Sequence, residues 1–281
     1  MTGLFSSGDD SKKVFYKTDD EIELIRQSCL IVSKTLAHVG SMLKPGVTGK
    51  EIDRAAEELI RDHGGRPAFK GYHDFPATLC VSFNDIVVHG IPSNREFRED
   101  DIVSVDCGVE LNGYYGDAAF TFPFTAVQPE VMELLSVTYG SLYKGIEQAV
   151  VGHRIGDIAF AIQDFAERKH GYGVVRELVG HGVGRSLHEE PEVPNYGKRG
   201  KGMVMREGLV IAIEPMVNLG VKEVYQAQDG WTIHTRDRKA SAHYEHSVAV
   251  RKNKADVLSD HNYILEAVKN NPALQIISPK S

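Results

Sequence analysis

Cysteine is scarce in this chain, and long apolar runs are missing. The three cysteines, Cys29, Cys80 and Cys107, are too few and too scattered for a disulfide framework, and they lack the C-x-x-C spacing of a structural zinc site. No apolar run approaches the ~20 residues that a membrane span requires. The opening residues, MTGLFSSGDDSKK, lack the apolar core of a signal peptide. We therefore expect a cytoplasmic protein with no membrane partner.

Positive charge is also limited. Lysine and arginine number 32 against 39 acidic residues, for a formal net charge of −7. No Lys/Arg-rich stripe with interleaved aromatics indicates a nucleic-acid surface, so we expect no nucleic-acid partner. The 281 residues, 42% hydrophobic and 25% charged, suffice for one large globular domain or two small ones.

Helical periodicity begins at Thr18, after a polar segment (residues 1–17) that we expect to be mobile. Thr18 and Glu21 have the spacing of a capping box, and apolar residues then recur at three- and four-residue steps as far as Val39. A turn and a second helix follow, ending at a glycine pair. The segments ATLCVSF, DIVSVDCGV and YYGDAAFTF are rich in β-branched and aromatic residues and are predicted strands.

The same pattern then repeats. Residues 127–170 read as a second helical pair, and REGLVIAIEPMV (206–217) aligns with REDDIVSVDCGV (98–109), which puts Asp106 on Glu214. Helix, turn and strand in the same order predict a duplicated α+β unit whose two copies face each other. Three further pairs coincide in this overlay: Gly46 with Gly152, Ile52 with Ile158 and Ala55 with Ala161.

Four acidic residues stand in otherwise apolar, strand-like segments. Asp106 and Glu214 occupy the superposed strands, and Glu245 precedes the last apolar strand. Asp117 lies across a predicted hairpin turn at Asn112-Gly113 from Asp106, which would bring these two aspartates together. Buried carboxylates are costly unless they are paired, hydrogen-bonded or bound to a cation. None of the four has a lysine or arginine beside it in its strand.

The stretch LVGHGVGRSLHEEPEVPNY (178–196) carries His181 and His188 among glycines and prolines. These breakers predict a loop, which is where ligands and catalytic groups usually lie. Taken alone, one surface histidine and one core histidine would explain the stretch as well. The four acidic residues favour a metal-binding role for the stretch over this alternative, because the four cannot all stay ionised in one place without positive charge. Mixed oxygen and nitrogen ligands suit Zn²⁺, Mn²⁺, Fe²⁺ or Co²⁺ better than Ca²⁺, and five ligands fit two ions about 3.5–4 Å apart.

The motifs GHGVG with HEEP, AIEPM, SVDCG, GYYGD, SAHYEH, NDIVVHGIP (84–92) and GYHDFPATLCVSFN (71–84) together resemble the methionine aminopeptidases, type I in particular. The resemblance runs in continuous order over roughly residues 18–251. It implies a pita-bread fold, with internally duplicated α/β halves and antiparallel sheets around a dinuclear metal site. We accordingly expect a flexible segment (1–17), a catalytic domain (18–251) with no separate N-terminal domain, and a C-terminal extension (252–281). Within the extension, Asp260 would cap a short amphipathic helix.

The implied activity is that of a methionyl aminopeptidase, a metalloprotease that removes the N-terminal methionine from nascent proteins and peptides, preferably before a small second residue. A metal-activated water would attack the first peptide bond. His188 is implied to hydrogen-bond the scissile carbonyl or its oxyanion, His89 to contact the amide nitrogen, and Glu214 to accept the proton. The implied ligands of two divalent ions (Co, Mn, Fe or Zn) are Asp106, Asp117, His181, Glu214 and Glu245, with Asp117 and Glu245 bridging.

The resemblance also implies a pocket for the methionine side chain. It is formed by Phe69, Tyr72, Phe75, Cys80, Leu187 and Trp231, and His89 and His188 lie on its substrate side. Phe69 stands where the commonest bacterial pattern has a cysteine and Leu187 where it has an aromatic residue, which leaves pocket shape and inhibitor response open. One Na or K ion is implied at the backbone carbonyls of Asn84, Ile86 and Ser241. The family further suggests a monomer that meets its substrates at the ribosome, although no motif indicates that contact.

Two alternatives remain at this point. Another pita-bread hydrolase would cleave Xaa-Pro bonds, but the GYHDFPATLC segment argues against this. A non-catalytic pita-bread protein would bind RNA or protein, but such relatives lose metal ligands, whereas all five positions here hold suitable residues.

Overall fold

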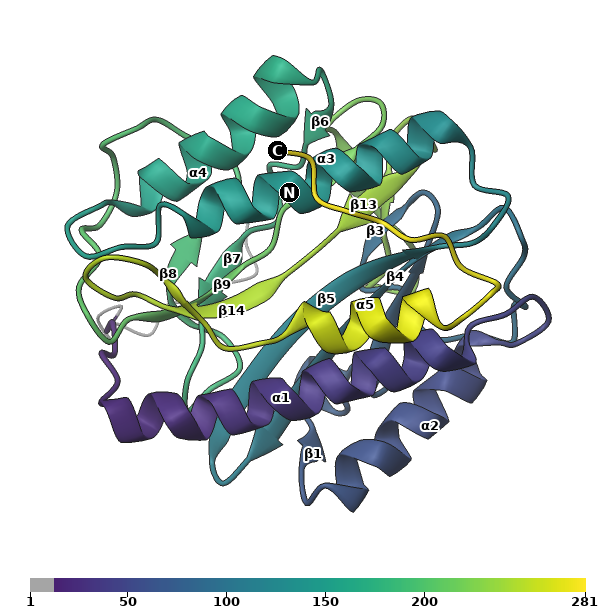
Figure 1. Ribbon diagram of the computed structural model, residues 1–281, viewed down its shortest axis with the longest axis horizontal. Coiled ribbons are helices and arrows are strands. Elements are labelled where there is room, and N and C mark those ends of the chain that lie inside the picture. Colours follow the sequence, from purple (N-terminus) through teal and green to yellow (C-terminus); the bar gives the residue numbers. More distant parts are fainter. Residues whose placement is uncertain (1–12) are drawn as a thin grey trace.

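The computed structural model describes residues 13–281 (Figure 1). Its helices are α1 (Asp19–Met42), α2 (Gly49–Asp62), α3 (Pro129–Ile146), α4 (Ile155–Gln163) and α5 (His261–Lys269), with short helical segments η1 (Tyr72–Asp74) and η2 (Asp164–Lys169). The strands are β1 (Arg66–Pro67), β2 (Leu79–Phe83), β3 (Ile86–Val88), β4 (Ile102–Leu111), β5 (Tyr114–Pro123), β6 (Gly173–Val174), β7 (Gly180–Gly182), β8 (Glu189–Val193), β9 (Val210–Ile213), β10 (Met216–Asn218), β11 (Val224–Gln226), β12 (Ile233–Thr235), β13 (Ser241–His243), β14 (His246–Ala249) and β15 (Asp256–Val257).

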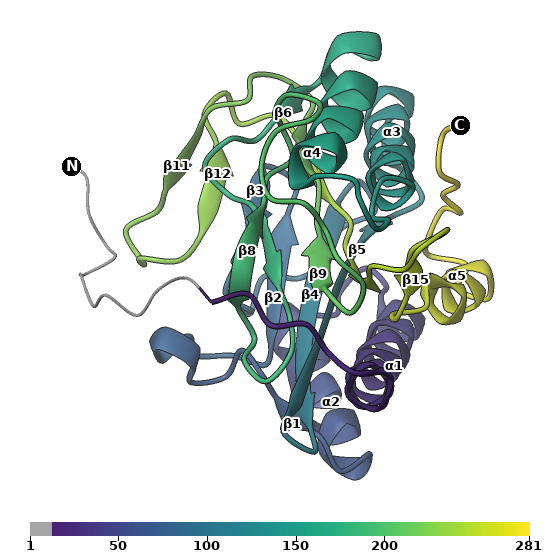
Figure 2. The same cartoon turned by 90° about the vertical axis from the view of Figure 1, so that its left-hand side faces the viewer.

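The helices cover one side of the strands. In Figure 2, α1, α3 and α5 lie to the right of the central strands, and the β11–β12 hairpin lies on the opposite side. Figure 1 shows the two helical pairs, α1 with α2 and α3 with α4, at opposite ends of this face. The named strands pair antiparallel, with β4 central in one sheet and β14, β9 and β7 consecutive in another. The predicted α+β class with antiparallel sheets is confirmed.

Helix α1 begins where the sequence predicts. The Thr18 side chain accepts the backbone N–H of Glu21, and the Glu21 carboxylate accepts that of Thr18, so both ends of the capping box are present. The apolar face of α1 is buried against β5, a long strand in the first half of the chain. The apolar residues that recur along this face are all fully or almost fully buried: Ile22, Ile25, Cys29, Val32, Leu36 and Val39.

The duplication extends to individual hydrogen bonds. Gly46 and Gly152 have backbone φ angles of 89° and 90°, a left-handed conformation that glycine adopts at little cost. The Gly46 N–H donates to Phe97 O at 3.1 Å, and the Gly152 N–H donates to Met205 O at 3.0 Å. The turn before the second helix is therefore closed in the same way in both halves.

The hairpin of β4 and β5 places the first two carboxylates. Asn112 and Gly113 both have positive φ, 55° and 79°, as the tight turn requires. In this register Asp106 faces Ala119 and Asp117 faces Gly108. Since residues two apart in a strand share a face, both aspartates project from the same side of the hairpin.

The second half departs from the single strand predicted over residues 206–217. Strand β9 ends at Ile213 and β10 begins at Met216, so Glu214 lies in a break rather than within a strand. Pro215 has no N–H to donate to a neighbouring strand, which explains the interruption. Glu245 lies in the matching break between β13 and β14. The two breaks are adjacent, because Met216 pairs with His243 and Ile213 with His246.

The two ends of the described chain both contact this body. Of the segment expected to be mobile, residues 1–12 lie outside the described residues, whereas Val14 forms a bridge with Glu190 and Tyr16 with Leu209. At the other end α5 is present as predicted, with the Asp260 side chain accepting from Asn262 N, and it packs along α1. Within residues 13–281, no helix has both the length and the apolar character needed to cross a membrane.

Gly116 should be irreplaceable where β5 meets α1. A Cβ at this position would lie 2.4 Å from Cys29 N and 2.8 Å from Cys29 Cα. We expect Gly116→Ala to destabilise the protein by about 1–3 kcal/mol or more, because α1 must move away from the sheet. The midpoint of urea unfolding measures this. Cys29→Ala should not rescue the variant, since the clash is with backbone, and an unchanged midpoint for Gly116→Ala would refute the close packing.

Candidate metal centre and substrate pocket

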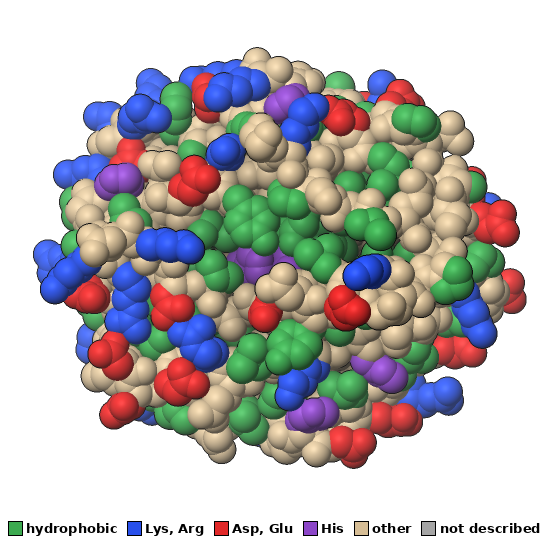
Figure 3. All heavy atoms as spheres, in the orientation of Figure 1, with side chains coloured by type: hydrophobic (Ala, Val, Ile, Leu, Met, Phe, Trp, Pro, Cys, Tyr) green, Lys and Arg blue, Asp and Glu red, His purple; other side chains and the backbone are tan. Residues whose placement is uncertain are grey.

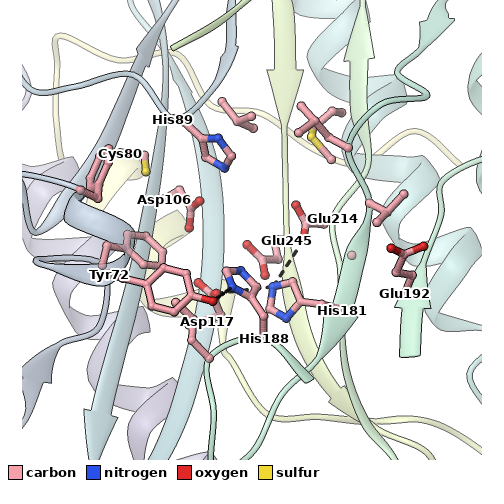
Figure 4. A pocket seen from close by; sticks show the side chains of 18 of the residues that line it. Tyr72, Cys80, His89, Asp106, Asp117, His181, His188, Glu192, Glu214 and Glu245 are labelled. Carbon is pink, nitrogen blue, oxygen red and sulfur yellow. Dashed lines mark hydrogen bonds and ion pairs between the residues drawn. The ribbon is translucent and has the colours of Figure 1, made fainter. Parts of the chain in front are cut away.

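The five predicted ligand residues converge on one cavity (Figure 4). One potential ligand atom each from Asp117, His181 and Glu245 lie within 4.8 Å of one another. His181 Nε2 is 3.6 Å from Glu214 Oε1 and 3.8 Å from Asp117 Oδ2. Asp106 lines the same cavity from β4. The fold thus brings together side chains that span residues 106 to 245.

The sequence predicted a loop around His181. The residue lies instead in the short strand β7, where the register shifts between Gly180 and Gly182. A Cβ at Gly180 would lie 2.3 Å from Ala212 O, and one at Gly182 would lie 2.4 Å from Glu190 O. The two glycines therefore let this strand fit between β9 and β8. They explain why the segment pairs despite its breaker-rich sequence.

The backbone also fixes the orientation of the His181 ring. His181 Nδ1 lies 2.9 Å from the carbonyl oxygen of Gly182. Because a carbonyl only accepts, Nδ1 carries the proton in this contact, and Nε2 presents its lone pair to the cavity. Such a second hydrogen bond is the usual support of a metal-binding histidine.

Several oxygens of these buried carboxylates have no hydrogen-bond partner in the described part of the chain. Asp106 Oδ1, Asp117 Oδ1 and Glu245 Oε1 are buried without a hydrogen-bond partner among residues 13–281. Burial raises the pKa of Asp106 and of Glu214 to about 7. Burial, and then repulsion from neighbouring carboxylates, raises the pKa of Asp117 and of Glu245 well above the ordinary range. Without cations, these groups would hold protons instead.

Unpartnered buried carboxylate oxygens and one correctly oriented imidazole form a donor set that fits divalent cations. Four carboxylates supply more negative charge than one divalent ion can balance, which favours two. The nitrogen donor suits Mn²⁺, Fe²⁺, Co²⁺ or Zn²⁺, whereas Ca²⁺ takes oxygen ligands.

Two further histidines line the cavity beside the centre. His188 Nδ1 lies 2.7 Å from the Tyr72 hydroxyl, and the His188 ring is 4.2 Å from the His181 ring. His89 has a left-handed backbone, with φ of 57°, directly after β3. Burial lowers the pKa of His89 to about 4 and, with the nearby His181, that of His188 to about 3. Both rings are therefore neutral at neutral pH.

The same cavity, about 450 Å³ in volume, has an apolar part beside the ligand residues. The Phe75 and Trp231 rings meet edge to face at 5.1 Å on one of its walls. All six pocket residues named from the resemblance line it: Phe69, Tyr72, Phe75, Cys80, Leu187 and Trp231. The sequence interpretation missed four apolar lining residues, Val88, Leu178, Val179 and Met216. In the sequence, only their position next to motif residues could have indicated that they line the pocket.

A buried ion pair that no sequence motif indicates supports the loop that carries His188. Lys17 Nζ contacts Glu189 Oε2 at 2.6 Å, with side chains 4% and 6% exposed, although the residues are 172 positions apart. The other Glu189 oxygen accepts the backbone N–H groups of Arg185 and Ser186. The loop before β8 is thereby held at three points.

The residues expected to hold a monovalent cation lie at and just before the starts of β3 and β13. The Ser241 N–H donates to Asn84 O at 2.8 Å, so these two backbones are in contact. Ile86 begins β3, two residues after Asn84. A cation at their carbonyls stays a prediction.

Comparisons with known proteins agree on one family. The sequence pattern of metallopeptidase family M24 matches residues 23–252. A methionine aminopeptidase of Clostridium acetobutylicum is 48% identical over 247 residues, covering 88% of this chain and 98% of that protein. Methionine aminopeptidase 1 of Bacillus subtilis is 44% identical over 246 residues, covering 88% and 99%.

Solved structures agree with these relatives. The crystal structure of methionine aminopeptidase from Rickettsia prowazekii superposes with a TM-score of 0.87 at 35% identity, covering 88% of this chain and 100% of that one. The enzyme from Thermotoga maritima gives 0.86 at 40% identity, with the same coverage. A prolidase from Pyrococcus furiosus gives 0.70 at 23% identity, covering 87% of this chain and 65% of that one, and shows the shared fold alone. The predicted pita-bread fold is confirmed.

The raised carboxylate pKa values predict how the metal-free protein responds to pH. A carboxyl group whose pKa is higher in the folded state stabilises the fold below its unfolded value, and this contribution is lost as pH rises through the folded value. With folded values of about 7 for Asp106 and Glu214, the Tm of metal-free protein should fall between pH 5.5 and 8. Mn²⁺ should raise the Tm more at pH 8 than at pH 5.5.

Scanning fluorimetry with and without EDTA measures both effects. Asp106→Asn removes one titrating carboxylate and should flatten the pH dependence of the metal-free Tm. A Tm that stays constant across this range in the metal-free protein would contradict the electrostatic description of the site.

Proposed function

The chain belongs to metallopeptidase family M24 and, within it, to the methionine aminopeptidases, and on that premise we propose that it removes the N-terminal methionine from nascent proteins and peptides. One observation supports this most strongly: five metal-binding side chains and an apolar pocket share a single cavity. The metal centre would cut the peptide bond, and the pocket would select the side chain.

In this proposal Asp106, Asp117, His181, Glu214 and Glu245 would hold two divalent ions, Asp117 and Glu245 serving both ions, Asp106 serving one, and His181 with Glu214 serving the other. When bound, the ions supply a water molecule of lowered pKa and polarise the carbonyl of the first peptide bond. One potential ligand atom each of Asp117, His181 and Glu245 lie within 4.8 Å of one another, which supports placing these three residues around the same ions.

The protein's own groups orient the substrate and move protons. Glu214 accepts the proton of the attacking water. His188 Nδ1 lies 2.7 Å from the Tyr72 hydroxyl, and with Tyr72 as the donor of this bond the neutral imidazole carries its proton on Nε2. His188 can then donate a hydrogen bond to the oxyanion. His89 lies across the cavity and is assigned to the amide nitrogen of the scissile bond.

The pocket favours an unbranched apolar side chain. Phe69, Cys80 and Leu187 are almost fully buried around it, and Trp231 covers its outer side. Leu187 and Phe69 keep the lining apolar, so methionine is accommodated although the two positions depart from the commonest bacterial pattern. We extend the proposal to a preference for a small second residue.

The cellular setting is proposed on chemical grounds. All three cysteines are free and buried, which suits a reducing cytoplasm. We propose that the enzyme acts there as a monomer, on chains emerging from the ribosome, with Co²⁺, Mn²⁺, Fe²⁺ or Zn²⁺ in the centre and one Na⁺ or K⁺ near Asn84.

Peptide hydrolysis tests the proposal directly. Anaerobically purified protein, stripped and then titrated with Mn²⁺, Fe²⁺ or Co²⁺, should release methionine from Met-Ala-Ser but little leucine from Leu-Ala-Ser. Mass spectrometry of the free amino acid is the readout, and Asp106→Asn should abolish release. Cleavage of Ala-Pro-Ser instead would keep the metal site and replace the substrate class. No cleavage of any peptide would overturn the function.

His188 should matter for turnover more than for binding. Removing one preorganised donor to an oxyanion typically lowers kcat by about 10²–10³-fold. We therefore expect His188→Ala to lower kcat by this order while KM for Met-Ala-Ser changes little. His63→Ala, at an exposed helix end, is the matched control. A His188→Ala variant with wild-type kcat would show that this histidine has another role.

A further inference from the structure

The chain beyond residue 252, where the family match ends, is packed against the body of the protein. Asn271 Nδ2 donates to both Gly40 O and Leu43 O at 2.7 Å and so caps the end of α1. The Lys280 N–H donates to Ser136 O on α3. In Figure 1 the segment crosses the helical face from α1 to α3, with α5 beside α1.

One residue of this segment contacts the backbone of Glu245, a proposed metal ligand. His261, the first residue of α5, is only 3% exposed. Its Nε2 lies 3.1 Å from the backbone carbonyl oxygen of Glu245, and its Nδ1 lies 3.2 Å from the Tyr139 hydroxyl. Its ring stacks on His246 with a centroid distance of 3.7 Å. Figure 3 shows the hollow on this face, with apolar and histidine side chains in it, and the cavity there is lined by both histidines.

The hydrogen bonds fix the proton on this imidazole. Burial lowers the pKa of His261 well below its ordinary value, so the ring is neutral and carries one proton. A carbonyl oxygen only accepts, so Nε2 must be the nitrogen that donates to Glu245 O. Nδ1 then accepts from the Tyr139 hydroxyl, which in turn contacts the half-buried Tyr143 hydroxyl at 3.3 Å. The hydrogen bonds therefore run from the Tyr139 hydroxyl, as donor, through His261 to the backbone carbonyl of Glu245.

Glu245 needs such support more than the aspartates do. It lies in the break between β13 and β14, outside the register of either strand, whereas Asp106 and Asp117 belong to long continuous strands. Its N–H donates to Ala119 O, which holds one side of the residue. The bond from His261 to its carbonyl holds the other side. Together these two bonds set the direction in which the buried carboxylate leaves the backbone.

We propose that His261 is a positioning residue of the metal centre, and that the segment beyond residue 252 is therefore a working part of the site. The inference rests on the proposed function in one respect, that Glu245 binds metal. His261 acts through the backbone of this ligand and touches neither ion nor substrate. Outer partners of metal ligands typically contribute about 10–100-fold to metal affinity.

The test measures Mn²⁺ affinity of the full chain by calorimetry, without any peptide. His261→Phe keeps an aromatic ring against His246 but removes the donor, and we expect it to weaken Mn²⁺ binding by about 10-fold or more. His261→Gln offers an amide N–H at a similar reach and should recover most of the affinity. Ile264→Ala, in the same helix and fully buried, should lower the Tm without lowering the Mn²⁺ affinity.

Two results would overturn the inference. One is a His261→Phe protein that binds Mn²⁺ as tightly as the wild type. The other is an Ile264→Ala protein that loses as much affinity as His261→Phe, since the histidine would then serve packing alone. If His261→Phe does not fold, Tyr139→Phe takes its place, because it removes the hydroxyl that orients the ring. Unchanged Mn²⁺ affinity in that variant would equally refute the role.

The outcome is separable from that of the proposed function. A wild-type protein that binds Mn²⁺ but releases no methionine would reject the function and leave the comparison of affinities valid. Methionine release by the wild type, with equal Mn²⁺ affinity in all variants, would reject only the role of His261.

Discussion

Four carboxylates line one cavity, and their mutual repulsion is the constraint on which the structure depends. Asp106, Asp117, Glu214 and Glu245 can be ionised together only if cations share their charge. The surrounding fold holds them in place without cancelling that charge, because some of their oxygens have no partner among residues 13–281. A protein that instead neutralised them with arginine or lysine would be easier to fold and would have no place for a metal. The large hydrophobic core, which contains residues of both halves, offsets the cost of this arrangement.

The duplicated architecture explains why the carboxylates meet. Each half contributes a helical pair and two antiparallel strands, and the site lies where the two sets of strands approach each other. The two halves direct their carboxylates into the cavity in different ways. In the first, Asp106 and Asp117 project from one face of an uninterrupted hairpin, so the pleat alone sets their direction. In the second, both glutamates lie at breaks, one caused by Pro215, and their longer side chains reach the cavity from positions that need hydrogen bonds from elsewhere.

The sequence predicted what depends on local order. Capping at Thr18, the turn at Asn112-Gly113 and the apolar periodicity of α1 follow from neighbouring residues, and the internal repeat pointed to Asp106 and Glu214 as a pair. Pro215 is a local signal for the break at Glu214 that the sequence analysis did not use. The strand at His181 has no such signal, because pairing there depends on how closely Gly180 and Gly182 let other strands approach. Contacts between residues far apart in the sequence, such as Lys17 with Glu189 or His261 with Glu245, have no local signature at all.

The positions of these two contacts in the chain affect how the enzyme is made. Lys17 is among the first described residues to be synthesised, yet its partner Glu189 follows after most of the chain, and His261 comes later still. The loop carrying His188 therefore cannot take its final form while only the first half exists, and the peptide plane of Glu245 is not fixed until α5 has been made. An enzyme that trims newly made proteins would itself complete its site only after α5 has been synthesised, so copies that stop before α5 would hold metal less tightly.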